Sequence, residues 1–194
     1  MKIVCLLSGG IDSTILLFRL KKNGHEIIPL FINYGQKAAK KEREAAQKAC
    51  EILDIKLNVI DIPGLSTISS GLTTNEISPI DTPVFPNRNL ILLSLGAAFA
   101  QTNSCQVIAI GLIEGTNFSD QTREFVKKLE STLSMEQNIS ILAPMITLNK
   151  LEVVRLAKEN KIPLDFTYSC YFGLDTPCNE CLSCKDRSNA FMIE

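Results

Sequence analysis

The stretch LLSGGIDSTILLFRL, residues 6–20, joins an apolar run to a helix-like pattern through two glycines, an aspartate and two hydroxyl residues. Glycine lets a backbone turn sharply and approach a ligand closely. The helix start that follows leaves N–H groups unpaired and carries partial positive charge. We therefore expect this loop to cradle a phosphate group. The cradle residues would be Ser8, Gly9, Gly10, Asp12 and Ser13.

The same stretch has an alternative interpretation as a simple helix-capping turn, with Ser8 or Asp12 as the cap. It lacks the Gly-Lys-Ser/Thr ending of the Walker P-loop, and no lysine lies in it. A bound phosphate would therefore be neutralised by backbone N–H groups, by hydroxyl groups and by Mg²⁺ held near Asp12.

Strand-like and helix-like patterns alternate along most of the chain, which is typical of an α/β fold with a doubly wound, mostly parallel sheet. In such sheets ligands bind at the carboxyl ends of the strands, where the 8–13 loop lies. Residues 61–87, rich in Pro, Ser and Thr, break the pattern and predict a functional loop that orders over substrate. We expect strands over residues 2–7, 25–34, 56–60, 106–112 and 139–144, and helices over 12–22, 36–53, 88–102, 120–133 and 150–160.

Composition narrows the classes of function. The chain has 194 residues, 45% of them hydrophobic, and a net charge of −1, which predicts one domain with a large core. No basic tract stands out, so binding to nucleic acid is not expected. The start, MKIVCLLSGG, is too short for a signal peptide or a membrane span, so we expect a cytoplasmic protein with no membrane contact. His25 is the single histidine, which excludes any mechanism that needs two.

Four of the seven cysteines follow the spacing C-x7-C-x2-C-x2-C. In a reducing compartment such clusters favour a metal over disulfides, and four thiolates suit a closed tetrahedral Zn²⁺ site. The surrounding tail has little periodic apolar content, so metal binding would supply its stability. An iron–sulfur cluster and redox cysteines are the alternatives. The metal ligands would be Cys170, Cys178, Cys181 and Cys184, while Cys5, Cys50 and Cys105 lie in apolar patterns and are expected in the core.

The residues SGGIDS (8–13) resemble the PP-loop signature SGGxDS of the N-type ATP pyrophosphatases, which have an adenine nucleotide alpha hydrolase-like fold. Members adenylate an oxygen of their substrate, release pyrophosphate, and let ammonia or sulfur displace AMP. The resemblance implies ATP and Mg²⁺ as cofactors. The ATP-binding residues that it implies here are Leu7, Ser8, Gly9, Gly10, Ile11, Asp12, Ser13 and Thr14.

Further motifs resemble the 7-cyano-7-deazaguanine synthase family nearly from end to end. That family is an ATP-dependent carbon–nitrogen ligase of queuosine biosynthesis, which converts 7-carboxy-7-deazaguanine and ammonia to an amide and then, with a second ATP, to a nitrile. The matching segments are FINYGQ (31–36), PNRNLILLSLGAAFA (86–100), GLIEGTNFSDQTREFV (111–126), TLNKLEVVRLA (147–157) and the tail that begins with TYSCY (167–171).

The resemblance assigns roles to residues that would otherwise be ordinary surface or helix positions. It implies a homodimer and two parts, a PP-loop domain over 1–165 and a zinc-binding segment over 166–194 packed on it. Asp12, Ser13 and Lys150 would be catalytic; Asn33, Tyr34 and Gln36 would also bind ATP; and Arg88, Asn89, Glu114, Phe118 and Ser119 would bind the substrate.

The departures from the family cluster on the substrate side. NFSDQTR (117–123) stands where the family has DFSGYPDCR, Gly115 is extra, and Asn87 replaces a glycine. A paralogue that adenylates a different carboxylate or deazaguanine acceptor therefore stays open. The other rivals are a PP-loop tRNA-modifying enzyme, disfavoured by the net charge of −1, a zinc-stabilised nucleotide-binding module without catalysis, and an NAD- or GMP-type synthetase, in which the four-cysteine tail is not expected.

Overall fold

A five-stranded parallel sheet forms the centre of the molecule. The computed structural model describes residues 1–80, 84–113, 118–136 and 138–192. The strands lie in the order β3-β2-β1-β4-β5, and each neighbouring pair is parallel. Their bounds are β1 (Lys2–Leu6), β2 (Glu26–Asn33), β3 (Asn58–Asp61), β4 (Val107–Ala109) and β5 (Ser140–Leu142).

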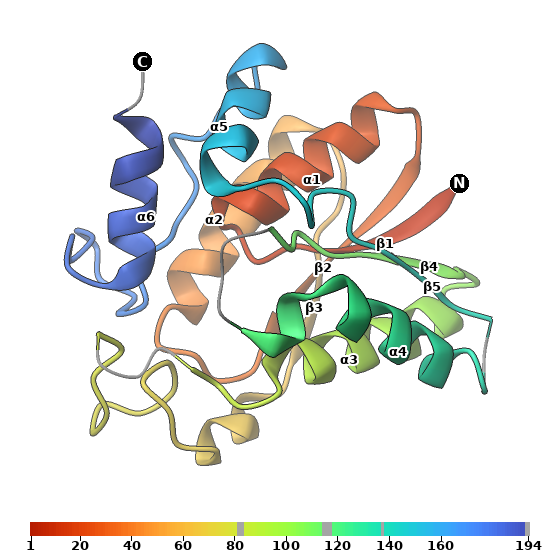
Figure 1. Cartoon of the computed structure of the whole chain (residues 1–194), viewed down its shortest axis with the longest axis horizontal. Coiled ribbons are helices and arrows are strands. Elements are labelled where there is room, and N and C mark those ends of the chain that lie inside the picture. The colour runs from red at the N-terminus through yellow and green to blue at the C-terminus, as the bar shows by residue number, and fades with distance from the viewer. Residues whose placement is uncertain (81–83, 114–117, 137, 193–194) are drawn as a thin grey trace.

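Helices cover both faces of this sheet, so that the molecule has three layers (Figure 1). One face packs against α1 (Ile11–Lys22), α2 (Ala39–Ile52) and α5 (Lys150–Glu159). The opposite face packs against α3 (Arg88–Thr102) and α4 (Arg123–Leu133). Among the described residues, no helix combines the length and the apolarity needed to cross a membrane.

The alternation of side chains along β1 explains why two apolar layers form. Ile3 and Cys5 belong to the core cluster under α1, α2 and α5, whereas Val4 and Leu6 belong to the cluster over α3 and α4. Successive residues of a strand point to opposite faces, so an uninterrupted apolar strand fits only where both faces are covered. Cys5, Cys50 and Cys105 are buried in these layers, as expected from their apolar surroundings.

The order of the strands reverses next to β1. The chain runs outward from β1 through β2 to β3, and then crosses back to β4 on the other side of β1. The carboxyl ends of β1 and β4 therefore meet at a switch point, the edge at which doubly wound sheets bind their ligands. This topology places the loop after β1 and the segment after β4 side by side, and it confirms the predicted doubly wound parallel sheet.

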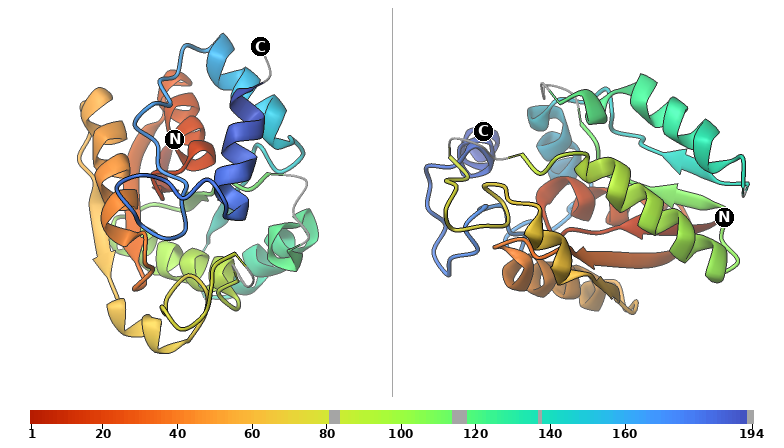
Figure 2. Two further views of the ribbon diagram at one scale, coloured as in Figure 1. Left: turned by 90° about the vertical axis from the view of Figure 1, so that its left-hand side faces the viewer. Right: turned by 90° about the horizontal axis from the view of Figure 1, so that it is seen from below.

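The C-terminal tail and the turn at 63–67 were not predicted as regular structure, and the helix expected over 120–133 is divided into a short turn and a helix that begins at residue 123. The tail contains α6 (Leu182–Phe191), and 3₁₀ turns lie at η1 (Pro63–Thr67) and η2 (Ser119–Gln121). Strands β4 and β5 are also shorter than their apolar runs. Residues 65, 72 and 85 of the long loop pack around Tyr34, next to Tyr171 of the tail, so the loop and the tail lie at one end of the sheet (Figure 2).

Candidate active site

The loop after β1, residues 8–13, is held against the side of α2. Gly9 has a φ of +77°, and a Cβ atom there would lie 2.3 Å from the carbonyl oxygen of Glu42 and 2.8 Å from the nitrogen of Ala46. Glycine is thus required at this position by both its backbone conformation and the closeness of α2. We call residues 8–13 the glycine loop.

Hydroxyl groups fasten the two ends of the glycine loop to each other. The Ser13 Oγ accepts a hydrogen bond from the Ser8 backbone N–H (3.2 Å), donates to the Gly10 carbonyl (3.1 Å) and lies 3.0 Å from the Ser8 Oγ. Helix α1 begins at Ile11 with Gly10 as its N-cap, and no side-chain cap hydrogen bond forms there. The capping interpretation of Ser8 or Asp12 is therefore not supported, and no side chain caps the N–H groups in the first turn of α1.

Several of the implied ATP-binding side chains are buried, including those of Ser13, Tyr34 and Gln36. Leu7, Ile11 and Thr14 are buried, and the Thr14 Oγ1 has no hydrogen-bond partner among the described residues. The backbone N–H of Leu7 is taken by the Leu30 carbonyl, at 2.9 Å. Leu7, Ile11 and Thr14 therefore support the glycine loop structurally, because their buried side chains anchor it in the core.

A lysine–aspartate pair stands at the start of α1. The Lys150 Nζ lies 2.7 Å and 2.6 Å from the two carboxylate oxygens of Asp12, and each side chain is 25% exposed. Asn149 caps α5 with a complete capping box, which fixes the backbone of the next residue, Lys150. Two segments 138 positions apart thus bring one acidic and one basic group together beside the glycine loop.

A third charged residue near this pair, Asp186 on α6, was not found from the sequence. The pKa of Asp186 is raised, mainly by desolvation and in addition by the nearby Asp12 carboxylate, while Lys150 opposes the shift. No sequence signal pointed to Asp186, because its helix lies in a tail without apolar periodicity.

The turn after β2 is built by the side chains that the sequence assigned to ATP. Asn33 donates from Nδ2 to Asp61 (2.9 Å) and accepts from the Gly35 N–H (3.0 Å). The Gln36 Oε1 accepts from the Tyr34 N–H (2.9 Å), and its Nε2 donates to the Glu42 carboxylate (2.8 Å). These contacts give Asn33 and Gln36 a structural task in holding the turn.

Arg88, the first residue of α3, reaches back to this turn. Desolvation lowers the pKa of Arg88, but Tyr34, Tyr171 and Glu42 outweigh it, so the pKa is raised. Burial raises the pKa of Tyr34 to about 12, and burial also raises that of Glu42 against the opposing effects of Gln36 and Arg88. The Tyr34 ring packs on Phe85 at 5.1 Å between centroids. An Arg, a Glu and two Tyr residues therefore meet beyond the end of β2.

Asn87 and Asn89 flank Arg88 with different functions. Asn87 has a φ of +53° in the left-handed region, which asparagine tolerates better than most residues; this explains how it can replace a family glycine. Asn89 is buried and hydrogen-bonds Asp120 instead of facing an open site. Ser119 begins η2 directly after Phe118, whereas Glu114 lies outside the described residues.

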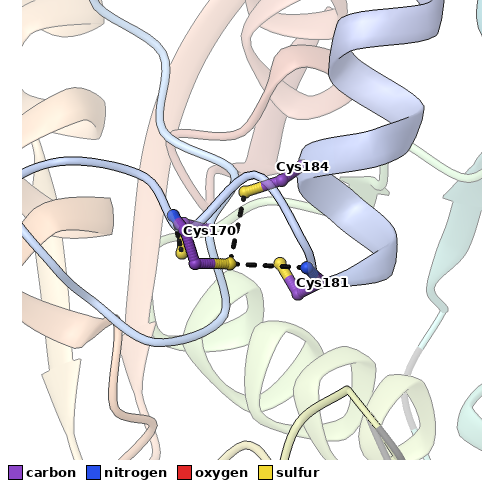
Figure 3. Close-up of side chains that lie close together, drawn as sticks. Cys170, Cys181 and Cys184 are labelled. Carbon is purple, nitrogen blue, oxygen red and sulfur yellow. Dashed lines mark hydrogen bonds between the residues drawn. The ribbon is translucent and has the colours of Figure 1, made fainter.

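The four clustered cysteines come together as their spacing predicts. Their Sγ atoms all lie within 4.8 Å of one another, and Cys184 joins from α6 (Figure 3). A tetrahedral zinc ion with Zn–S bonds of about 2.3 Å separates its sulfurs by roughly 3.8 Å, and the Cys178 and Cys184 sulfurs are 3.9 Å apart. The donor set therefore fits Zn²⁺.

The thiol groups of this cluster differ in acidity. Desolvation raises the pKa of Cys178, but hydrogen bonds from the Cys181 and Glu180 backbone N–H groups, with those from Cys170 and Cys181 side chains, outweigh it and lower the pKa to about 7. Burial raises the pKa of Cys181 and of Cys184. A bound cation is what would hold all four as thiolates.

The tail that carries these cysteines touches the glycine loop. The Tyr168 N–H donates to the Gly9 carbonyl at 3.0 Å. Gly173 has a φ of +71°, and a Cβ atom there would lie 2.3 Å from the Lys37 carbonyl oxygen. Lys41 also pairs with Asp175 at 2.5 Å. The cysteine tail, the turn after β2 and the glycine loop thus form one contiguous structure.

Solved structures with the same fold include two synthetases of nicotinamide nucleotides and a 4-thiouridine synthetase. NMN synthetase from Francisella tularensis superposes with a TM-score of 0.56 at 18% identity, covering 92% of this chain and 70% of that one. The NH3-dependent NAD synthetase from Campylobacter jejuni gives 0.54 at 19%, covering 85% and 66%. A 4-thiouridine synthetase–RNA complex with bound ATP gives 0.54 at 18%, covering 98% and 50%. The fold and the glycine loop define the PP-loop class.

The family follows from a comparison of sequences. Residues 2–194 match the model of the family described as queuosine biosynthesis protein QueC. The 7-cyano-7-deazaguanine synthase of Campylobacter jejuni is 35% identical over 98% of this chain and 93% of its own length. The 7-cyano-7-deazaguanine synthase 1 of Desulfitobacterium hafniense is 37% identical over 99% and 92%. The chain belongs to the QueC family, which confirms the predicted family and an ATP-dependent ligase activity.

Proposed function

We propose that this chain converts 7-carboxy-7-deazaguanine and ammonia to 7-cyano-7-deazaguanine at the expense of ATP. The observation that carries the proposal is the match of residues 2–194 to the QueC family, whose curated relatives bear the name of this synthase. A carboxylate is a poor electrophile until one of its oxygens becomes a leaving group. Transfer of AMP to that oxygen supplies the leaving group, and ammonia then attacks the carbonyl carbon. A second ATP would drive the amide to the nitrile.

The glycine loop would hold the phosphates of ATP. The backbone N–H groups at the start of α1 would supply hydrogen-bond donors where pyrophosphate develops negative charge. The Ser8 and Ser13 hydroxyls, which bond each other and the Gly10 carbonyl, would hold the loop in shape and donate to phosphate oxygens only by exchanging those bonds. Donors that are fixed before the reaction cost no reorganisation during it. Asn33, Tyr34 and Gln36 would line the nucleotide side, with Asn33 and Gln36 acting mainly by fixing the turn.

Asp12 and Lys150 would act on different charged groups of the bound nucleotide. The Asp12 carboxylate is an oxygen ligand of the type that Mg²⁺ prefers, and the Lys150 ammonium would stabilise the transferring phosphate. Their direct contact at 2.6–2.7 Å keeps both groups neutralised before ATP arrives. We expect ATP and Mg²⁺ to exchange partners with this pair.

Arg88, Phe118 and Ser119 would form the substrate side, together with Glu114 outside the described residues. The Arg88 guanidinium is fixed by Tyr34 and Glu42 and can attract a carboxylate. Asn89 would act here by holding the start of α3, because it is buried against Asp120. The substrate would be a small molecule, with no nucleic acid involved.

The four cysteines would hold one Zn²⁺ that organises residues 166–194 on the domain formed by residues 1–165. A closed site of four thiolates leaves no position for catalysis, so its task would be structural. The homodimer and the cytoplasmic location expected from the sequence stay predictions.

A turnover assay tests the proposed function. The protein is incubated with 7-carboxy-7-deazaguanine, ATP, Mg²⁺ and ammonium, and the nitrile, AMP and pyrophosphate are measured. We expect all three products. Release of ADP and phosphate would contradict adenylation.

A second candidate is a paralogue that acts on a different carboxylate. The observation that favours it is the sequence of the 117–123 segment, which lacks the Gly-Tyr-Pro run and the cysteine of the family. Binding of 7-carboxy-7-deazaguanine without formation of the nitrile in the same assay would support the paralogue.

A further inference from the structure

Two residues that follow β4, Gly111 and Asp120, contact different parts of the candidate site. Gly111 passes so close to α1 that a Cβ atom would lie 3.0 Å from the Ser13 nitrogen and 3.1 Å from the Asp12 carbonyl oxygen. Asp120 contacts the first turn of α3. Gly111 therefore lies against the glycine loop, and Asp120 lies against the helix that carries Arg88.

The contact of Asp120 caps a helix that lacks a cap of its own. Asn87, the N-cap of α3, makes no side-chain cap hydrogen bond. The Asn89 N–H instead donates to the Asp120 Oδ2 (3.2 Å), and the Asn89 Nδ2 donates to the Asp120 carbonyl (3.2 Å). A carboxylate at this position also compensates the positive end of the helix dipole. Asn89 is only 4% exposed, so burial holds its side chain in the position that contacts Asp120.

Hydrogen bonds within the turn connect the residues next to Asp120 to Phe118 and Ser119. The Gln121 N–H donates to the Phe118 carbonyl (3.1 Å), and the Thr122 Oγ1 donates to the Ser119 carbonyl (3.1 Å). The same Thr122 Oγ1 accepts the Phe125 N–H and caps α4. The position of Asp120 thus determines where Phe118 and Ser119 stand.

We propose that Asp120 is a positioning residue that sets the spacing between the Phe118–Ser119 turn and Arg88, and thereby the binding of the carboxylate substrate. The inference rests on the proposed function. Asp120 itself acts through the start of α3 and need not touch the substrate. The ATP side is anchored separately, by Gly111 and by the contacts of the glycine loop.

The test compares Asp120→Ala with Asp120→Asn in the full-length protein. Loss of the acceptor in Asp120→Ala should raise the KM for 7-carboxy-7-deazaguanine by about tenfold, the size of effect expected for a lost helix cap. The KM for ATP should change by less than about twofold. Asp120→Asn keeps an acceptor oxygen and should restore most of the substrate KM, because asparagine caps helices as well as aspartate.

Glu130→Ala is the matched control. The Glu130 Oε2 accepts the Ile141 N–H at 2.5 Å, so this variant also removes a carboxylate bound to a backbone N–H, but beside β5. It should lower the melting temperature without changing either KM. A substrate KM that is unchanged in Asp120→Ala, or raised equally with that for ATP, would overturn the role of Asp120. Absence of nitrile with the unaltered protein would instead overturn the proposed function.

Discussion

The ammonium group of Lys150 contacts both carboxylate oxygens of Asp12, which joins the first turn of α5 to the first turn of α1. At the other end of the same two helices, the Lys22 Nζ donates to the Asn160 Oδ1 at 2.8 Å. Two lysine contacts thus link one pair of helices, but only the first lies beside the glycine loop. This arrangement provides a variant and its control within one interface.

We expect Lys150→Met to reduce the release of pyrophosphate by at least ~100-fold, because a cation near the transferring phosphate is lost. Lys22→Met removes a lysine from the exposed end of the interface and should leave turnover within about twofold of normal. Pyrophosphate is measured in the presence of saturating ATP, carboxylate and ammonium. Equal losses in the two variants would mean that Lys150 serves only to hold the helices together.

Substitution of Gly9 should destroy the glycine loop, whereas the same substitution at Gly24 should not. The two glycines have φ values of +77° and +76°, but a Cβ atom at Gly24 meets nothing within 4 Å. Gly24→Ala should therefore lower the free energy of unfolding only by the strain of a left-handed backbone conformation, about 1–2 kcal/mol. Gly9→Ala adds a collision with α2, so we expect a larger loss and no measurable ATP binding by titration calorimetry. Normal ATP affinity in Gly9→Ala would exclude the loop as the phosphate site.

Removal of one cysteine from the cluster should release the metal. We expect one Zn²⁺ per chain by elemental analysis and its loss in Cys181→Ser, together with rapid proteolysis of the tail, since an incomplete thiolate set binds zinc poorly. Cys105→Ser is the control, because its Sγ lies outside the cluster and hydrogen-bonds the Lys2 and Val107 carbonyls, bonds that a serine hydroxyl can replace. Iron in the purified protein, or full zinc content in Cys181→Ser, would contradict this site.

The pH dependence of stability should include a contribution from Glu42. Burial raises the pKa of this carboxyl above its unfolded value. The stability that it contributes is therefore fully present below the unfolded pKa of about 4.3 and is lost as pH rises through the folded pKa. Glu42→Gln should remove this loss, so the free energy of unfolding of the variant should rise relative to the unaltered protein as the pH increases above the unfolded pKa of about 4.3.

Urea titrations at several pH values measure this difference. Glu44→Gln, on the exposed side of the same helix, is the control and should show a parallel pH profile. A Glu42→Gln variant whose profile also ran parallel to that of the unaltered protein would show that Arg88 fully compensates the buried charge.

The sheet and its helices were predictable because their apolar periodicity extends over whole elements. Residues 88–102 form a helix as expected, and the glycine loop lies at the end of β1 because two glycines interrupt a strand-to-helix transition. The cysteine spacing likewise predicted a compact cluster, since four ligands within fifteen residues need no long-range folding.

Contacts between distant segments could not be predicted in this way. Asp120 and Asn89 are ordinary polar residues in sequence, and only the approach of η2 to α3 makes them partners. Helix α6 escaped prediction because its buried residues are few and small, with Cys184 and Ala190 among them. Arg88 was assigned through the family alone, and its network with Tyr34 and Glu42 depends on three elements that meet in space.

The hydrogen bond between the Tyr168 N–H and the Gly9 carbonyl has a consequence for biosynthesis. Gly9 leaves the ribosome long before Tyr168, and at ~5–20 residues per second the interval is roughly ten to thirty seconds. During that time the nascent chain has its glycine loop without the tail residue that hydrogen-bonds it. The contacts of the glycine loop are therefore complete only after the cysteine tail has emerged from the ribosome and packed against it, so the loop at the start of the chain depends on the last part of the chain to be made.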